Sequence, residues 1–221
     1  MVVAIDGPAG VGKTTTAKIL ADKLGFMYLD TGAMYRSMTY LFLQRNVDLN
    51  DREDVNKNII LFENNVEFKI QNPMKIYLFK KDISQEIRKV DVTNFVSQVS
   101  AIDDVRKSMV KIQRSVATKG NVVVEGRDIG TVVFPDAKFK FFLTAEYEVR
   151  ALRRLKEFNN MNENINVNQI KEDLLTRDNY DSNRKISPLK KAEDAFEIDT
   201  TNCSIDEQVS VIFQEIEKRN E

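Results

Sequence analysis

The chain has 221 residues, of which 42% are hydrophobic and 30% are charged, and its formal net charge is −1. This length and composition suit one α/β domain, and the balanced charge gives no reason to expect a nucleic-acid or membrane-surface partner. Histidine is absent and cysteine occurs once, so the sequence excludes an imidazole base, a histidine-ligated metal and an internal disulfide.

The same features favour a cytoplasmic protein. A single cysteine, Cys203, fits a reducing compartment, and no apolar run approaches the ~18 residues that a membrane span needs. The strand that we predict at the N-terminus leaves no room for a signal peptide. No exposed apolar stripe requires a dimer, so we expect a monomer.

The first predicted element is a strand over Met1–Asp6, which leads directly into the string Gly7-Pro8-Ala9-Gly10-Val11-Gly12-Lys13-Thr14. An amphipathic helix follows, with Ala17, Leu20, Ala21 and Leu24 on one face and Gly25 as its stop. A G-x-x-x-x-G-K-T string between a strand and a helix is typical of a phosphate-binding loop. The alternative, a glycine-rich turn followed by a chance Lys-Thr pair, does not explain this context.

The residue types of this loop suit a nucleoside triphosphate. Glycines let backbone N–H groups surround phosphate oxygens, Lys13 brings a positive charge to the β- and γ-phosphates, and Thr14 offers a hydroxyl to Mg²⁺. The new helix also points its positive end at the phosphates. We therefore predict an ATP site with Mg²⁺ as cofactor, made of Gly7, Pro8, Ala9, Gly10, Val11, Gly12, Lys13, Thr14 and Thr15.

The next elements interrupt a simple strand–helix alternation. We predict a strand at 26–29, helices at 30–45 and 51–64, and strands at 66–70 and 75–79 separated by Asn72-Pro73. The section 47–90 has the pattern of an insertion with its own small hairpin. A helix capped by Asp103 or Asp104 then carries Val105, Met109, Ile112 and Val116 on one face and is closed by Gly120.

The C-terminal half returns to alternating strands and helices. We predict strands at 122–124, 139–143 and 196–199, helices at 146–158 and 167–180, and an asparagine-rich mobile loop at 159–168. Ser204 and Glu207 form a capping box for a last helix with Ile205, Val209, Ile212 and Ile216 as its core stripe. This order predicts an α/β fold of the P-loop NTPase type, with a parallel sheet flanked by helices.

Arginines concentrate in four further places: Arg36, Arg106, Arg127 beside Asp128, and a C-terminal group of Arg150, Arg153, Arg154, Arg177 and Arg184. Arginine's planar fork suits phosphates and base edges. Each place has a structural alternative. Arg153 and Arg154 also fit a solvated helix face, Arg177 and Asp181 a surface pair, Arg106 a partner of Asp103, and Asp128 a turn residue. If one helix extends that far, Arg177, Asp181 and Arg184 share a face.

Several strings together resemble those of the bacterial-type cytidylate (CMP) kinases, and the resemblance covers nearly the whole chain. These strings are Ile5–Thr14, Leu29–Arg36, Ser97–Val99, Val105-Arg106, Gly126–Pro135, Arg177–Arg184 and Pro188-Leu189. The run Gly126–Pro135 is the most specific of them. Position 125 is a departure from the pattern, since it is Glu in this chain and Asp is expected there about as often.

The resemblance implies a nucleoside-monophosphate kinase: one domain over 1–221, with a monophosphate-binding region and insertion at 30–100 and a lid at 150–170. It implies that Ser97, Arg106 and Asp128 read cytosine and that Arg36 and Arg127 hold the CMP phosphate. Thr31, Arg177 and Asp181 would contact the sugar or the phosphates. Lys13, Arg153, Arg154 and Arg184 would act on the transferring phosphoryl group.

The reaction that the resemblance implies is transfer of the ATP γ-phosphoryl group to CMP or dCMP, with no other partner than these small molecules. Two alternatives stay open at this point. One is a P-loop kinase for another acceptor, such as AMP, UMP or shikimate, and the other is a nucleotide sensor that binds without transfer.

Overall fold

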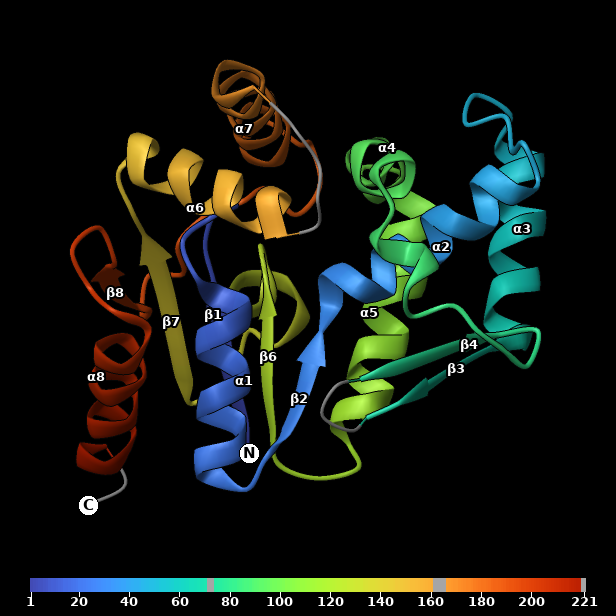
Figure 1. Ribbon diagram of the computed structural model, residues 1–221. Helices are drawn as coiled ribbons and strands as arrows, with labels where there is room; N and C mark the ends of the chain where they lie inside the picture. Colours follow the sequence, from blue (N-terminus) through green and yellow to red (C-terminus); the bar gives the residue numbers. More distant parts are fainter. Residues whose placement is uncertain (71–73, 161–165, 220–221) are drawn as a thin grey trace. The chain divides into compact units, whose positions relative to one another are not determined.

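The structure, a computed structural model, describes residues 1–70, 74–160 and 166–219 (Figure 1). The chain divides into two compact units. Unit 1 consists of Met1–Phe26 and Val122–Glu221, and unit 2 consists of Met27–Asn121. In the described ranges, no helix has both the length and the apolar character that crossing a membrane requires.

Unit 1 is built on a parallel sheet. Its strands β1 (Val2–Asp6), β6 (Val122–Gly126), β7 (Phe139–Thr144) and β8 (Phe196–Asp199) lie in the order β6-β1-β7-β8. β1 pairs with β6 on one side and with β7 on the other, and β7 pairs with β8. The central strands are continuous apolar runs because both of their faces are covered, and Val3, Ala4 and Ile5 are fully buried.

Helices flank this sheet. They are α1 (Lys13–Leu24), α6 (Tyr147–Asn160), α7 (Val167–Ser182) and α8 (Ile205–Lys218). α1 packs against α8 and β6, and α6 packs against α7 (Figure 1). A five-residue π-helical turn, η2 (Ile129–Val133), follows β6. The predicted α/β fold with a parallel sheet is therefore confirmed.

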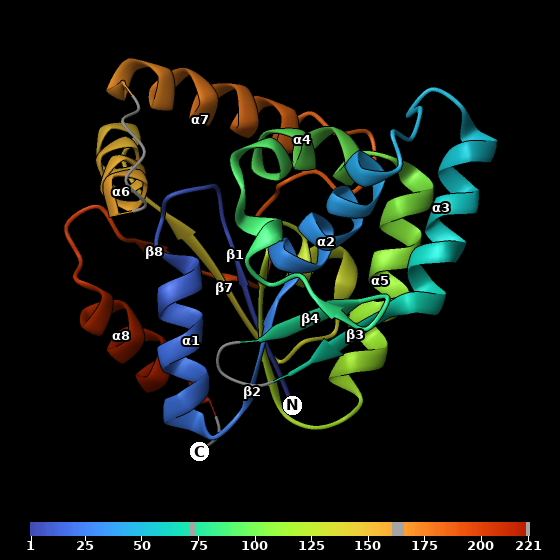
Figure 2. The same cartoon turned by 45° about the vertical axis from the view of Figure 1, so that its right-hand side comes forward.

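Unit 2 contains the helices α2 (Thr31–Gln44), α3 (Arg52–Asn65), α4 (Val90–Ser100) and α5 (Asp103–Ala117). β2 (Met27–Asp30) begins the unit, and β3 (Val66–Lys69), β4 (Lys75–Leu78) and β5 (Lys81–Asp82) form an antiparallel sheet. A short 3₁₀ helix, η1 (Glu86–Arg88), precedes α4. α2 contacts α3, α4 and α5, and α3 runs beside α5 (Figure 2).

Most element positions predicted from the sequence are confirmed within one or two residues. The hairpin strands lie at 66–69 and 75–78, although Asn72 and Pro73 are outside the described residues. Gly25 ends α1 in the left-handed conformation at φ 67°. Ser204 and Glu207 form the reciprocal capping box of α8, where Val209, Ile212 and Ile216 are buried and Ile205 is only half-buried.

The sequence analysis missed one helix, and two of its local predictions are wrong. The sequence analysis gave no helix at 90–100, where valines favour a strand, but α4 buries Val92, Val96 and Val99 along one face. Neither Asp103 nor Asp104 caps α5, because the helix begins one residue earlier than expected, with Ile102 at its N-cap. α5 also ends at Ala117, before Gly120.

Both ends of the predicted loop at 159–168 belong to helices, because α6 reaches Asn160 and α7 begins at Val167 behind the N-cap Asn166. Its middle, 161–165, lies outside the described residues. The lid at 150–170 includes this gap and stays a prediction.

Candidate active site

The loop Gly7–Thr14, hereafter the P-loop, connects β1 to α1 with backbone conformations that require glycine. Gly7 has φ 146°, and a Cβ added there would lie 2.2 Å from the carbonyl oxygen of Leu143. Gly12, the N-cap of α1, is left-handed at φ 95° and has no side chain to cap the helix. The first N–H groups of α1 are therefore arranged as in an anion site at a helix N-terminus.

Lys13 is the buried cation of this loop. Its side chain is 6% exposed, and its Nζ donates a hydrogen bond of 2.5 Å to the carbonyl oxygen of Pro8. Burial lowers the pKa of the Lys13 ammonium well below its ordinary value, and the charge of Arg127 lowers it further, while Glu125 opposes the shift. A bound phosphate would supply the negative charge that stabilises the ammonium.

Thr14 and Glu125 offer oxygen ligands at the start of α1. The Thr14 hydroxyl donates to Glu125 Oε2 over 2.9 Å, and Glu125 is buried at the end of β6. Hydroxyl and carboxylate oxygens are the ligands that Mg²⁺ takes in nucleotide sites. These residues therefore fit the cation, although no group of three cysteine, aspartate or glutamate side chains within the described ranges is arranged to hold a metal unaided.

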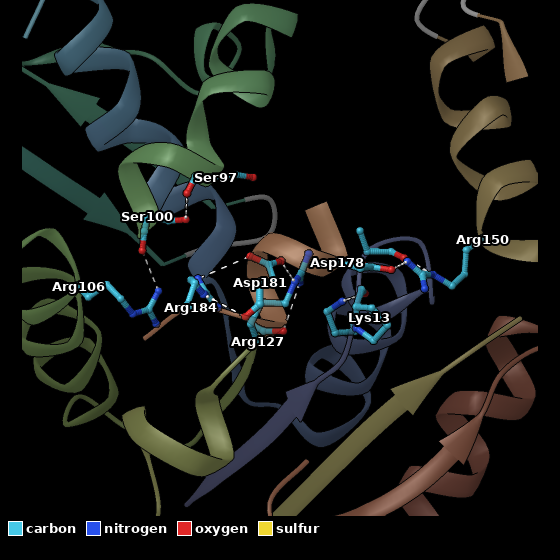
Figure 3. A network of polar contacts seen from close by, with 12 residues as sticks. Lys13, Ser97, Ser100, Arg106, Arg127, Arg150, Asp178, Asp181 and Arg184 are labelled. Carbon is cyan, nitrogen blue, oxygen red and sulfur yellow. Dashed lines mark hydrogen bonds and ion pairs between the residues drawn. The ribbon is translucent and has the colours of Figure 1, made fainter. Parts of the chain in front are cut away.

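The second concentration of charge in unit 1 is the arginine–aspartate cluster, which consists of Arg127, Asp181 and Arg184 (Figure 3). Arg127 Nε donates to Asp181 Oδ2 over 3.0 Å, and Arg184 Nη1 lies 3.7 Å from Asp181 Oδ1. Burial by itself raises the pKa of Asp181, but the charges of Arg127, Arg177 and Arg184 outweigh it and lower the pKa. Asp181 is 4% exposed, so the interpretation of Arg177 and Asp181 as a surface pair is wrong.

One helix does not carry all three residues that were expected to share a face. α7 ends at Ser182, so Arg184 lies beyond its C-cap, Asn183. Arg184 still reaches the cluster because the chain turns back, and its Nε donates to the Asp181 carbonyl oxygen over 3.3 Å. The same carbonyl accepts from Leu189 N over 2.8 Å, which fixes the turn.

The three arginines of α6 have different surroundings. Arg153 donates to Thr200, with 2.6 Å to the carbonyl oxygen and 3.1 Å to the hydroxyl, and Arg154 pairs with Glu157 at 2.5 Å. Arg150, which the sequence analysis did not assign to the site, donates to the carbonyl oxygen of Ala9 over 2.7 Å. It also forms an ion pair with Asp178 of α7 (Figure 3). Arg150 therefore ties the P-loop backbone to α7.

Asp6 is a second residue that the sequence analysis missed. It ends β1, is 5% exposed, and accepts from Ile129 N over 2.8 Å and from Gly130 N over 2.7 Å. Burial raises the pKa of Asp6 to about 6, against the lowering effect of these two donors. A charged residue at the end of an apolar strand was the available signal.

In unit 2, Arg106 and Arg36 each contact groups that hold the guanidinium in place. Arg106 is buried, its Nη1 donates to the Ser100 carbonyl oxygen over 3.1 Å, and its guanidinium lies 5.3 Å from the Tyr35 ring centre. Asp103 pairs with Lys107 at 3.0 Å. Arg36 Nη2 lies 3.4 Å from Asp30 Oδ2.

The remaining candidates have the following places. Ser97 is half-buried on α4, and its carbonyl oxygen accepts from Ser100 Oγ over 3.2 Å (Figure 3). Thr31 is buried at the first position of α2, behind the N-cap Asp30. Thr15 is exposed on α1, and Asp128 is buried immediately before η2.

Comparisons with known proteins agree on one family. A family model described as cytidylate kinase matches residues 3–218. The cytidylate kinase of Clostridioides difficile is 48% identical over 217 residues, covering 98% of this chain and 98% of that protein. The cytidylate kinase of Carboxydothermus hydrogenoformans is 46% identical over 224 residues, covering 100% of this chain and 99% of that protein.

Solved structures add a comparison of fold alone. An uncharacterized protein from Eubacterium ventriosum superposes with a TM-score of 0.53 at 13% identity, covering 99% of this chain and 98% of that one. At this identity the likeness says nothing of chemistry.

Proposed function

Because the chain belongs to the cytidylate kinase family, we propose that it transfers the γ-phosphoryl group of ATP to CMP, and to dCMP, giving ADP and the corresponding diphosphate. The observation that carries the proposal is the presence in unit 1 of two separate sets of cationic groups. One is the P-loop with buried Lys13, and the other is the arginine–aspartate cluster. A kinase must neutralise phosphates on two substrates, whereas a nucleotide sensor needs only one such set.

The donor phosphates fit the P-loop. Its backbone N–H groups and the N-terminus of α1 would bind the β- and γ-phosphates, with Lys13 Nζ leaving Pro8 to meet them. Thr14, with Glu125 beside it, would hold Mg²⁺, which supplies positive charge to the phosphate oxygens. Thr15 belongs to the same segment and presents its side chain outward.

The acceptor needs no general base. The second ionisation of a phosphate monoester has a pKa of about 6, so a CMP oxygen is already largely anionic at neutral pH. That oxygen forms a new bond to the γ-phosphorus while the bond between the γ-phosphorus and the bridging oxygen breaks, and ADP leaves with the electron pair. The absence of histidine from the sequence is compatible with this step.

We assign the acceptor residues of unit 1 by the chemistry of their side chains. Asp128 is an acceptor for the exocyclic amine of cytosine, a pairing that carboxylates make with this base. Arg127 would bind the CMP phosphate, and Asp181 with Arg177 would contact the ribose or the phosphates. Arg153, Arg154 and Arg184 would stabilise the transferring group, for which Arg153 and Arg154 must leave Thr200 and Glu157.

In unit 2, we assign Ser97 and Arg106 to cytosine, Arg36 to the phosphate, and Thr31 to the sugar or the phosphates. Arg106 supports this assignment because Tyr35 and the Ser100 carbonyl hold its guanidinium in one orientation. A fixed planar donor suits the N3 and O2 acceptors of cytosine. The monomeric state, the cytoplasmic location and the lid at 150–170 stay predictions.

The test is ADP release from Mg·ATP with CMP, dCMP, UMP, AMP, GMP and shikimate as separate acceptors. We expect fast turnover confined to the cytidine monophosphates. A different preferred acceptor would overturn the base-reading roles of Ser97, Arg106 and Asp128. ATP binding with no turnover on any acceptor would identify a sensor instead.

The variant Asp128→Asn examines base reading directly. It keeps the size of the side chain but replaces one acceptor oxygen with a donor amide, so the preference for CMP over UMP should fall by about 10-fold or more. An unchanged preference would contradict the role of Asp128.

A further inference from the structure

We propose that Asp6 is a positioning residue for acceptor selection, because its carboxylate fixes the backbone that carries Asp128. The inference rests on the proposed function, since it presumes that Asp128 reads cytosine. It adds a residue from β1 that does not itself touch the base. The residues that carry it all belong to unit 1.

The first observation is the way the two carboxylate oxygens of Asp6 are used. Oδ1 accepts from Ile129 N over 2.8 Å and Oδ2 accepts from Gly130 N over 2.7 Å. These are the first two residues of η2, whose early N–H groups have no partner within the turn. A side chain at the end of one strand therefore caps a turn more than 120 residues away along the chain.

The second observation is that Asp128 immediately precedes the two residues that Asp6 holds and is itself hydrogen-bonded to η2. Its carbonyl oxygen accepts from Val132 N over 2.9 Å and from Val133 N over 3.1 Å. The peptide groups that follow it are held by Asp6, so both the carbonyl of Asp128 and the next two amides are fixed. With φ −143° and ψ 24°, Asp128 lies outside the regular helix and strand regions, at the point where the chain leaves β6 and enters η2.

The third observation is that the opposite side of η2 is also held. The stem of Lys140 packs beneath Gly130, where an added Cβ would lie 3.1 Å from Lys140 Cδ and 3.5 Å from Asp6 Oδ2. Lys140 Nζ donates to the Pro135 carbonyl oxygen over 2.5 Å and to Asp194 over 2.8 Å. The turn is thus held by Asp6 at the amides of its first two residues and by Lys140 at Gly130 and at Pro135 beyond its last residue.

Asp6 also connects this turn to the P-loop, because it immediately precedes Gly7. A displacement of the Asp6 carboxylate would move the amides of residues 129 and 130 and with them the side chain of Asp128. An error of 1 Å in the place of a recognition group costs up to about 10²-fold in rate, so a small movement suffices to alter selection.

The experiment compares kcat/KM for CMP and for UMP in the wild type, in Asp6→Asn and in Asp194→Asn. Asparagine keeps the size of the side chain but faces one of the two amides with its own N–H group. We expect the CMP-to-UMP ratio to fall by about 10-fold in Asp6→Asn, mainly through kcat/KM for CMP. Asp194→Asn, which removes an exposed carboxylate from the other side of the turn, should leave the ratio within about 2-fold.

The possible outcomes separate the inference from the proposed function. A wild type without turnover on CMP would overturn both. A wild type active on CMP, with an unchanged ratio in a folded Asp6→Asn, would overturn only the role of Asp6. Equal losses on CMP and UMP would also overturn it, because they indicate a general structural effect.

If Asp6→Asn does not fold, Gly130→Ala provides the same comparison without a change of charge. Its methyl group would lie 3.1 Å from Lys140 Cδ, so either the Lys140 stem or the Gly130 peptide that Asp6 holds must shift by a few tenths of an ångström, and the ratio should fall by about 3-fold or more. An unchanged ratio in folded Gly130→Ala would then overturn the proposal.

Discussion

Two regions of unit 1 present positive charge in different ways. The P-loop uses backbone N–H groups at the start of α1 together with one buried lysine, and neighbours in the sequence supply all of these groups. The arginine–aspartate cluster uses side chains from just after β6, from the last turn of α7 and from just beyond it, the first more than 50 residues from the others. Within the cluster, Asp181 already neutralises part of the arginine charge.

The difference affects how each region responds to its ligand. The P-loop is organised by the backbone, so a phosphate meets donors that need little rearrangement. The cluster is organised by ion pairs, so a phosphate must compete with a carboxylate for the guanidinium groups of Arg127 and Arg184. The carboxylates Asp6 and Asp181 also differ, because the pKa of Asp6 is raised and that of Asp181 is lowered.

The largest expected effect is on the P-loop. Lys13→Ala removes the ammonium group from the γ-phosphate, and kcat with ATP and CMP should fall on the order of 10²-fold or more. Steady-state ADP release measures this, with Lys18→Ala on the same helix as a control. A kcat close to that of the wild type would show that the backbone donors of the P-loop are sufficient for phosphoryl transfer without Lys13.

Asp181→Asn tests the cluster. It leaves Arg127 and Arg184 without their shared carboxylate, and the free energy of unfolding at pH 7 should fall by about 2 kcal/mol. Because the pKa of Asp181 is lowered, its stabilising contribution is present above its ordinary pKa and is lost as the pH falls through the folded pKa.

Denaturant unfolding at neutral and acid pH measures both parts of this prediction. Asp173→Asn is the matched control, since Asp173 is exposed on the same helix. A loss of stability that stays constant down to acid pH would contradict an ion-pair role for Asp181.

Asp6 should show the opposite dependence on pH. Its pKa is raised from 3.8 to about 6, with Asp128 and Lys13 as the charged groups that act on it besides burial. The folded state therefore holds the proton more tightly, and this contribution to stability is present below pH 3.8 and is lost as the pH rises through about 6.

Between pH 4.5 and 7.5, the unfolding free energy of Asp6→Asn should consequently rise by about 2 kcal/mol relative to that of the wild type. Asp194→Asn should show no such rise, because hydrogen bonding to Lys140 lowers the pKa of Asp194. Parallel pH profiles for the wild type and Asp6→Asn would rule out a raised pKa at Asp6.

The smallest expected effect concerns the link between the P-loop and α7. A double-mutant cycle with Arg150→Met and Asp178→Asn should give a coupling energy of about 1 kcal/mol, typical of a partly buried charged pair. Arg150→Met should cost more than Asp178→Asn, since it also removes the hydrogen bond to the Ala9 carbonyl. A coupling energy near zero would mean that Arg150 holds the P-loop independently of α7.

Features that depend on short-range spacing could be predicted from the residues alone. The buried strand, the glycines and Lys13-Thr14 predicted the P-loop and α1, and the capping box predicted the start of α8. The apolar runs at 122–124 and 139–143 predicted two strands of the parallel sheet. Each of these patterns is local, because the formation of a helix turn or a strand depends on residues only a few positions apart in the sequence.

The contacts between side chains that are distant in the sequence could not be predicted, because they depend on how the chain folds. It brought Asp6 to the amides of Ile129 and Gly130, Arg127 to Asp181, and Arg150 to Ala9. It also made 90–100 a helix, because packing against α2 outweighs the strand preference of valine. No residue spacing in the sequence predicts these long-range contacts or the helix at 90–100, since they depend on burial and on contacts between segments that fold together.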